Sequence, residues 1–184
     1  MLLNAAGCTS TRMYTYSVTD KNVICGSVNA DLGNVAVITE TAWRSDQKEP
    51  IKRKKMALNE IRKAFKTIPC GNISLPDGIK NQNWSNLSEM AILKNYTNKD
   101  IDTVILIRVE ELSPRLKLTY SLPFLWSGTS VADFHIRMVS VKTGEVLNDM
   151  RVKRITGGPF NIRPAKWSGT ELNAALRSIL KKGY

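Results

Sequence analysis

The residues of this chain that could do chemistry are few: three cysteines, Cys8, Cys25 and Cys70, and a single histidine, His135. No two of the cysteines form a Cys-x-x-Cys pair, and one histidine does not complete the four-ligand set of a structural zinc site. His135 falls on the polar face of an expected strand, where no acid or nucleophile can be assigned to it. The chain has no Gly-x-Ser-x-Gly motif. We therefore expect no metal, no cofactor, no small-molecule substrate and no enzymatic activity.

Cys8 follows the small residues Ala5-Ala6-Gly7. This arrangement resembles the end of a bacterial lipoprotein signal, in which the cysteine is lipidated and becomes the mature amino terminus. The position usually held by leucine is Ala5, and only seven residues precede the cysteine, fewer than a signal peptide needs. A true start upstream of Met1 would explain this. The resemblance implies that residues 1–8 are a partial signal and that Cys8 carries a membrane anchor; the alternative is a chance match.

The other two cysteines leave two interpretations open. If Cys8 is lipidated, Cys25 and Cys70 could form a disulfide in an oxidising periplasm. In a cytosolic protein they would be two small buried side chains. Residues 9–33 are rich in Ser, Thr, Asn and Gly, which favours a flexible tether before a domain over residues 34–184. Thr9 in place of aspartate after the cysteine implies the outer membrane, with the domain facing the periplasm.

The net charge of +11 and the pI near 9.7 favour an anionic environment, such as nucleic acid, lipid headgroups, lipopolysaccharide or the cell wall. The sequence contains no run of about 18 apolar residues, the length that a helix needs to span a bilayer. The competing hypothesis to an envelope protein is a cytosolic nucleic-acid-binding domain. The basic residues are scattered over a helix, a hairpin and the tail, and do not form a stripe with aromatic residues, so the sequence disfavours nucleic acid as a partner.

The fold is organised around one strand. Val104 to Val109 is almost continuously apolar and β-branched, which is typical of a strand covered on both faces. Shorter patterns predict strands at 35–39 and 115–122. Apolar residues at three- and four-residue steps predict a helix over 53–68, and a second, shorter helix is expected at 87–96. Ser168 and Glu171 form a capping-box pattern at the start of a last helix. Its apolar stripe is Leu172, Ala175, Leu176, Ile179 and Leu180.

Residues 131–141 and 146–155 predict a β-hairpin. A three-residue loop, Thr143-Gly144-Glu145, aligns Met138 with Met150. One face of the hairpin is then apolar and points inward: Phe134, Ile136, Met138, Met150 and Val152. The other face is polar and points outward: Asp133, His135, Arg137, Asp149, Arg151 and Lys153.

The order strand, helix, helix, buried strand, strand, hairpin, helix resembles the small α/β domain of periplasmic lipoproteins related to the curli-secretion lipoprotein and the amino-terminal domain of the Tol-system propeller protein. The phrases that carry the resemblance are Asn34-Val-Ala-Val-Ile, Met56-Ala57 with Ala64-Phe65, Ile101-Asp-Thr-Val-Ile-Leu-Ile107 and Val139-Ser-Val-Lys-Thr-Gly-Glu-Val146. It implies an α/β (α+β) domain with a single mixed sheet of about four to five strands and helices packed on it. It also implies an envelope adaptor or assembly factor.

The function we expect is therefore that of a lipid-anchored adaptor or assembly lipoprotein that binds another envelope protein or the cell wall. Two surfaces are candidates for the partner. One is the outward hairpin face with Arg137, Arg151 and Lys153. The other is the apolar loop of Phe124, Leu125 and Trp126, which could instead fold back onto the core.

Overall fold

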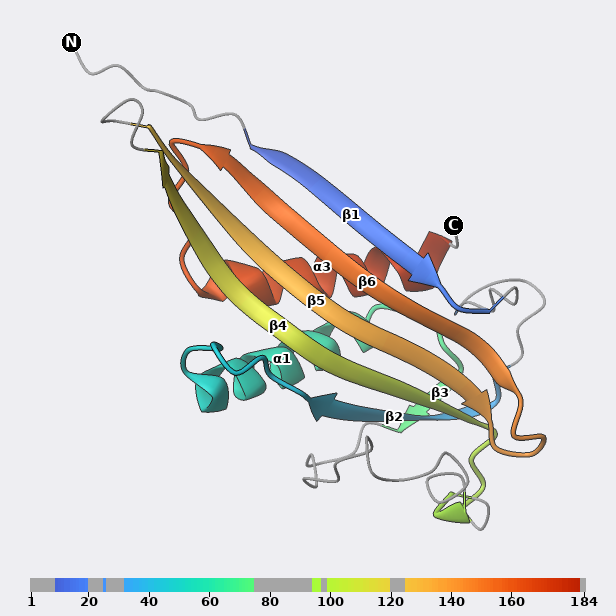
Figure 1. Cartoon of the computed structure of the whole chain (residues 1–184). Coiled ribbons are helices and arrows are strands. Elements are labelled where there is room, and N and C mark those ends of the chain that lie inside the picture. The colour runs from blue at the N-terminus through green and yellow to red at the C-terminus, as the bar shows by residue number, and fades with distance from the viewer. Residues whose placement is uncertain are drawn as a thin grey trace.

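The computed structural model describes residues 9–19, 25, 32–74, 94–96, 99–119 and 125–182. Within these residues a six-stranded sheet has the order β1-β6-β5-β4-β2-β3 (Figure 1). β2 runs parallel to β3 and β4, and the other neighbours are antiparallel. The elements are β1 (Ser10–Ser17), β2 (Asn34–Thr41), α1 (Pro50–Phe65), β3 (Asn72–Ser74), β4 (Thr103–Thr119), β5 (Leu125–Ser140), β6 (Val146–Pro159) and α3 (Lys166–Lys182). The fold class is the α+β class expected from the sequence.

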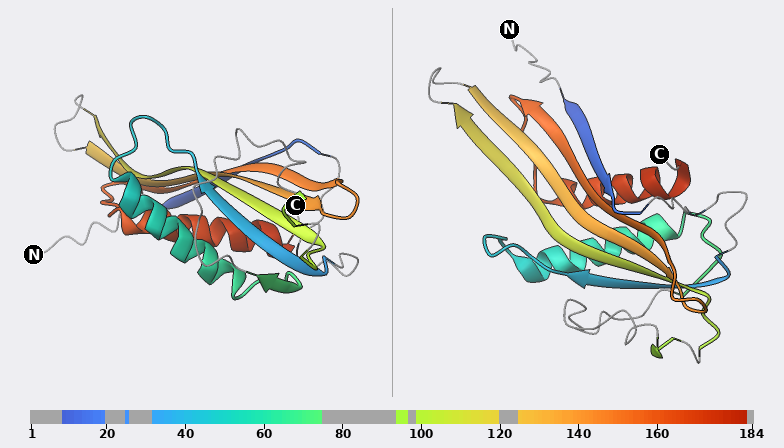
Figure 2. Two further views of the ribbon diagram at one scale, coloured as in Figure 1. Left: turned by 90° about the horizontal axis from the view of Figure 1, so that it is seen from below. Right: turned by 45° about the vertical axis from the view of Figure 1, so that its right-hand side comes forward.

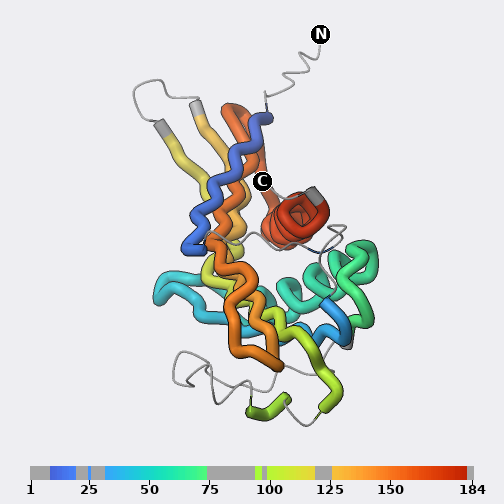
Figure 3. Tube along the Cα trace, turned by 90° about the vertical axis from the view of Figure 1, so that its right-hand side faces the viewer, coloured from blue at the N-terminus to red at the C-terminus, as the bar shows by residue number. Residues whose placement is uncertain are grey.

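Both described helices cover the same face of the sheet (Figures 2 and 3). Their apolar stripes and the inward residues of β2, β4, β5 and β6 form one buried cluster. All five residues of the predicted α3 stripe are at most 2% exposed. The helices also contact each other closely, since a Cβ on Gly169 of α3 would lie 2.6 Å from Met56 of α1. Asn173 Nδ2 donates to the carbonyl of Glu60 at 2.9 Å.

The central strand is buried on both faces, as its composition predicts. Ile105, Ile107 and Val109 face the helices. Val104 and Leu106 belong to a second, smaller cluster on the opposite face, against which Tyr96 and Val141 are among the residues that pack. The prediction for residues 104–109 is confirmed.

β4 continues through Pro114 to residue 119, so the separate strand predicted at 115–122 is the far half of the same strand. β2 ends at Thr41, and the Gln47 side chain takes its place beside β4: its amide donates to the carbonyl of Leu112 at 3.1 Å and accepts from the Leu112 N–H at 3.3 Å. In a strand alternate residues point their N–H to the same edge, so a Pro114 N–H would have faced this unpaired edge. Proline is tolerated at such a position.

The hairpin loop is longer than expected. Ser140 N–H donates to the carbonyl of Glu145, and Gly144 N–H, at φ +70°, donates to the carbonyl of Ser140, each at 2.9 Å. This loop alone would mix the two faces, but Leu147 forms a β-bulge that restores the alternation. Met138 therefore pairs with Asn148, not Met150. The predicted register is wrong by two residues, whereas the predicted inward face is buried as expected.

The tether predicted over residues 9–33 is wrong at 10–17, because this segment is β1 and pairs along β6. Thr and Tyr favour strands, and β1 covers an edge of β6 that would otherwise be open. Met13 and Thr15 are half-buried, while Tyr14 and Tyr16 are exposed. β1 and the short β3 raise the number of strands to six, above the four to five expected.

The helix boundaries also differ from those predicted. α1 begins at Pro50, after Glu49 at φ 51°, because proline suits the first helical position. α3 begins at Lys166, so the capping box predicted at Ser168 and Glu171 is wrong. The Glu171 carboxylate contacts β6, where it accepts from Arg154 Nε at 2.6 Å and from Thr156 Oγ1 at 2.7 Å. The helix expected at 87–96 lies outside the described residues except for its last three.

Cys25 and Cys70 form a disulfide, with a Cα–Cα distance of 4.5 Å. Both residues are at most 1% exposed and belong to the main core cluster. Of the two interpretations left open by the sequence, the structure contains the bonded one.

Neither of the described helices is long and apolar enough to cross a bilayer.

Candidate functional site

The face of the sheet opposite α1 and α3, here called the open face, carries most of the sheet's charged residues. The alternation of each strand places its polar set there. Four carboxylates on β2, β4, β5 and β6 are buried on this side, at 4–6% exposure. They are Glu40, Glu111, Asp133 and Asp149. Because buried carboxylates need charged or hydrogen-bonding partners, their neighbours determine what the face can do.

Asp149 lies between two residues of β5. One carboxylate oxygen makes a short contact with Nε2 of His135, and the other lies 3.2 Å from Nε of Arg137. The side chain of Asp149 is 8% exposed, against 29% for His135 and 31% for Arg137. The single histidine thus belongs to a cross-strand cluster around Asp149 and is not a freely solvated residue.

Asp133 is the centre of a second cluster. Arg151 donates to both of its oxygens, at 3.2 and 3.3 Å, and Lys153 lies 3.5 Å away. Arg151 also reaches Glu110 at 2.6 Å. The hydrogen bond to Asp133 is the main reason that the pKa of Arg151 is raised above its ordinary value. The three cations predicted to bind a partner, Arg137, Arg151 and Lys153, are therefore together on one face, but each is paired with a buried acid.

The second predicted surface is only partly described. Phe124 and the side chain of Leu125 lie outside the described residues. Trp126, at the start of β5, is half-buried and packs edge-to-face against Phe160, with 5.3 Å between ring centroids. Leu118 is the register partner of Trp126, and is 54% exposed. An apolar surface therefore does exist at this end of β4 and β5, although it is not confined to the predicted loop.

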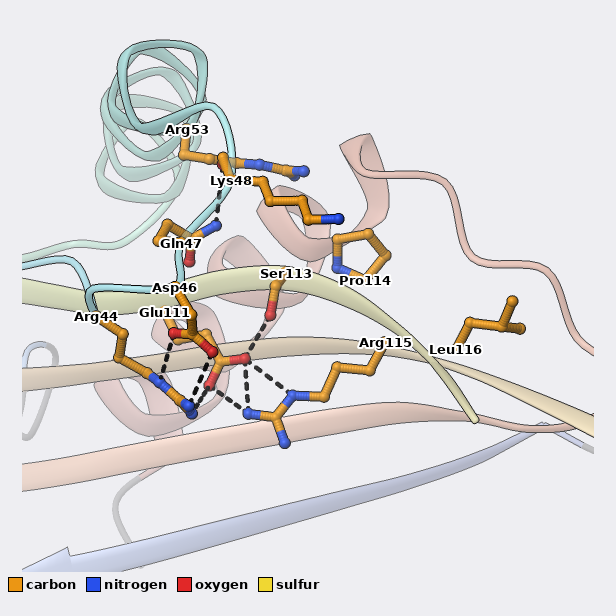
Figure 4. Close-up of a pocket in the computed structure, with 10 residues that line it drawn as sticks. All are labelled: Arg44, Asp46, Gln47, Lys48, Arg53, Glu111, Ser113, Pro114, Arg115 and Leu116. Atoms are coloured by element: carbon orange, nitrogen blue, oxygen red, sulfur yellow. Dashed lines mark hydrogen bonds and ion pairs between the residues drawn. The ribbon is translucent and has the colours of Figure 1, made fainter. Parts of the chain in front are cut away.

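The described residues also form a pocket that the sequence did not predict. It lies where β4 runs beyond the end of β2 and has a volume of about 550 Å³ (Figure 4). Glu111 is the central residue. Its carboxylate accepts from Arg115 at 2.6 and 2.7 Å and from Ser113, and lies 3.5 Å from Arg44. Burial alone would raise the pKa of Glu111, but the hydrogen bonds from Arg115 and Ser113 and the charges of both arginines lower it overall.

Arg53 of α1 closes the pocket on the helix side. Its Nη1 donates to the carbonyl of Ala165 at 3.0 Å and contacts Ser168 Oγ at 3.4 Å. Burial lowers its pKa, and the charge of Glu49 partly opposes this effect. Arg53 ties α1 to the start of α3, which identifies it as a structural contact between the two helices.

The lowered pKa of Glu111 predicts a specific acid sensitivity. A carboxylate whose pKa is lower in the folded than in the unfolded state stabilises the fold. This stabilisation is fully present at pH values above the unfolded-state pKa, which is about 4.3 for glutamate. That contribution is lost as pH falls through the folded pKa. In Glu111→Gln the decline in unfolding free energy below about pH 4.3 should be shallower than in the parent, measured by urea denaturation from about pH 6 to 2. Asp46→Asn, at an exposed carboxylate of the same pocket, is the control; equal slopes for parent and Glu111→Gln would contradict the assignment.

Glu111 is held ionised between two arginines, so it is a poor proton donor near neutral pH. In the described part of the chain no group of histidine, cysteine, aspartate and glutamate residues could hold a metal ion. The open face is thus a charged surface on which Glu111, Asp133 and Asp149 are paired with basic side chains.

Sequence reasoning missed the pocket because its residues come from the loop after β2 and from β4, about 65 positions apart. Gln47 and Leu112 illustrate this separation. No local motif marks such a pairing. The one local signal was the two-residue spacing of Glu111, Ser113 and Arg115, which places them on one side of a strand if the strand continues through Pro114.

No family model and no curated protein matches this chain. Solved structures with a similar fold do exist. A PelC dodecamer from Paraburkholderia phytofirmans is 12% identical, with a TM-score of 0.46, covering 95% of this chain and 99% of that one. Lipoprotein GNA1162 from Neisseria meningitidis is 12% identical, with a TM-score of 0.45, covering 80% and 97%. Protein CT253 from Chlamydia trachomatis is 9% identical, with a TM-score of 0.44, covering 80% and 91%. These values describe a broadly similar course of the chain and nothing of activity or partners.

Proposed function

We propose that this chain is a lipid-anchored protein of the bacterial cell envelope. Cys8 carries the lipid, the outer membrane holds it, and the domain faces the periplasm. There it acts as an adaptor or assembly lipoprotein that binds another envelope protein or the cell wall. In this proposal the domain belongs with the small α/β domains of the curli-secretion and Tol-system group.

The observation that carries the proposal is the division of the three cysteines. Cys25 and Cys70 are joined in a disulfide, which is typical of proteins that fold in an oxidising compartment. The remaining cysteine, Cys8, is the one preceded by Ala5-Ala6-Gly7. A compartment that favours disulfides and a cysteine placed for lipidation support the same location.

The open face is the surface that we propose for the partner. Exposed tyrosines of β1 lie beside its cations: Tyr14 pairs with Lys153, and Tyr16 with Arg151. Tyrosine and arginine are enriched where proteins bind one another. Reversing Arg151 or Lys153 would leave Asp133 buried among like charges, so binding tests should change Tyr14 and Tyr16 instead.

The test is metabolic labelling with a palmitate analogue in a bacterium that expresses the full upstream reading frame. We expect the parent to be labelled and Cys8→Ser to be unlabelled. A Cys25→Ala/Cys70→Ala variant, which keeps Cys8, should be labelled like the parent. Absence of label from the parent, with the protein soluble in the cytosol, would contradict the proposed function.

A further inference from the structure

One end of the domain exposes a group of apolar side chains, here called the end patch. It consists of Leu116, Leu118, Trp126, Phe160 and Ile162. Leu116, Leu118, Phe160 and Ile162 are 64%, 54%, 43% and 75% exposed. Leu118 pairs with Trp126, and Trp126 packs on Phe160 while its carbonyl accepts from the Phe160 N–H at 2.8 Å. Exposed apolar groups that cluster in this way mark a binding surface.

The segments that form this end, residues 9–13, 113–119, 125–131 and 154–167, carry basic residues and contain no aspartate or glutamate. The basic residues are Arg12, Arg115, Lys117, Arg154, Arg163 and Lys166. Arg115 is paired with Glu111, and Arg154 and Arg163 are paired with Glu171. Arg12, Lys117 and Lys166 are not buried. The opposite end carries both signs, with Asp100, Asp102 and Glu145 as well as Lys99 and Lys142. The end patch is therefore complementary to a surface that is apolar beneath and negatively charged above.

The end patch lies where the chain leaves the domain toward Cys8. Ser10, the first residue of β1, pairs with Gly157 near the end of β6. Thr9 Oγ1 accepts from Asn161 Nδ2 at 2.9 Å, and Asn161 lies between Phe160 and Ile162. The views agree that the start of β1, the end of β6 and the far ends of β4 and β5 lie together (Figures 1 and 3).

We propose that the end patch lies in the headgroup region of an anionic lipid membrane. The apolar side chains insert among the acyl-chain boundaries, to a depth of about 5–10 Å for interfacial segments. Arg12, Lys117 and Lys166 face lipid phosphates. This inference rests on the proposed function for the identity of the membrane, but the contact belongs to the folded domain and does not need the lipid on Cys8.

The contact would fix the orientation of the domain. A domain held by a lipid on Cys8 alone could tilt about that one attachment, whereas a second attachment at the same end would hold the sheet at a set angle. The opposite end, with the β5–β6 hairpin, would then point away from the membrane. The open face, along the side of the domain, would stay accessible to a partner.

The experiment uses the unlipidated full chain, Cys8→Ser, and co-sedimentation with vesicles of phosphatidylethanolamine and phosphatidylglycerol. We expect the protein to bind these vesicles. Binding should weaken when salt is added, and should be weaker to vesicles of phosphatidylcholine alone. Leu116→Ser/Leu118→Ser should weaken binding at least about tenfold, because two exposed leucines no longer enter the membrane. The matched control is Tyr16→Ser/Val18→Ser, which removes two side chains of similar exposure, 62% and 74%, at and just beyond the other end of β1.

Equal binding by the leucine variant and the control would overturn the proposal, as would no binding by the Cys8→Ser parent. A dimer in sedimentation that the leucine variant alone abolishes, without vesicle binding, would overturn it by showing that a second copy occupies the end patch. All four replaced side chains are exposed, so circular dichroism should show folded proteins. Absence of palmitate label with intact vesicle binding would contradict the lipid anchor on Cys8 and support the membrane contact of the end patch. Palmitate labelling without vesicle binding would support the anchor and contradict the contact.

Discussion

Replacing Leu176 by aspartate is expected to unfold the domain. Leu176 is fully buried in the cluster that joins α3 to the sheet. The change removes an apolar side chain from a packed core and places a carboxyl group among apolar side chains, which cannot form hydrogen bonds or ion pairs with it. Such substitutions cost about 5 kcal/mol or more, which matches the lower end of the roughly 5–15 kcal/mol that stabilises a typical domain. Far-ultraviolet circular dichroism and a urea titration at room temperature measure the result.

Arg177→Asp is the matched control for this change. It introduces the same side chain at the next position of α3, where the residue is exposed. Its effect should stay within about 1 kcal/mol, as is usual for surface substitutions. A Leu176→Asp protein as stable as the parent would show that the α3 stripe does not form part of the core.

Loss of the Cys25–Cys70 disulfide should give the second large effect. The bond closes a loop of 45 residues, and restricting a loop of that length in the unfolded chain is worth about 4 kcal/mol in the chain-entropy treatment. Cys25→Ala/Cys70→Ala should therefore unfold at a much lower urea concentration than the parent. Alanine is chosen because both positions are buried among apolar neighbours.

Reductant separates the bond from the packing of its sulfur atoms. Dithiothreitol should destabilise the parent by nearly the same amount as the double substitution, and should leave the double variant unchanged. A parent whose urea midpoint does not respond to reductant would mean that the two thiols are not joined in solution.

The parts of the fold that sequence predicted are those in which burial controls residue type along a short stretch. Residues 104–109 had to be apolar on both faces because a second cluster lies behind them, and the α3 stripe had to repeat every three to four residues. The inward face of the hairpin was correct for the same reason. In these cases the spacing of the apolar residues alone decides which face is buried. A register error of two residues leaves each side chain on the same face, so the predicted face stays correct.

The predictions that were wrong concern residues whose structure depends on partners distant in the sequence. β1 has a polar composition, and only the open edge of β6 makes it a strand. Glu171 fits a capping box, but α3 begins earlier, at Lys166, and the Glu171 carboxylate accepts from Arg154 and Thr156 of β6. Gln47 replaces a strand beside Leu112, and so lets β4 continue through a proline. The pocket around Glu111 depends on the last of these, because it forms where the loop that contains Gln47 meets β4, and no local pattern marks that meeting.

The pairing of β1 has a consequence for the order in which the protein can assemble. Ser10 has Gly157 as its neighbour, so the first strand to be synthesised waits for the last strand before it can be paired. Until the ribosome has passed the β5–β6 hairpin loop, β1 has no partner in the sheet, because it joins β6 alone. Completion of the sheet is therefore a late event that follows the synthesis of nearly the whole chain. A truncation before β6 would leave two unpaired strand edges, on β1 and β5, both open to aggregation.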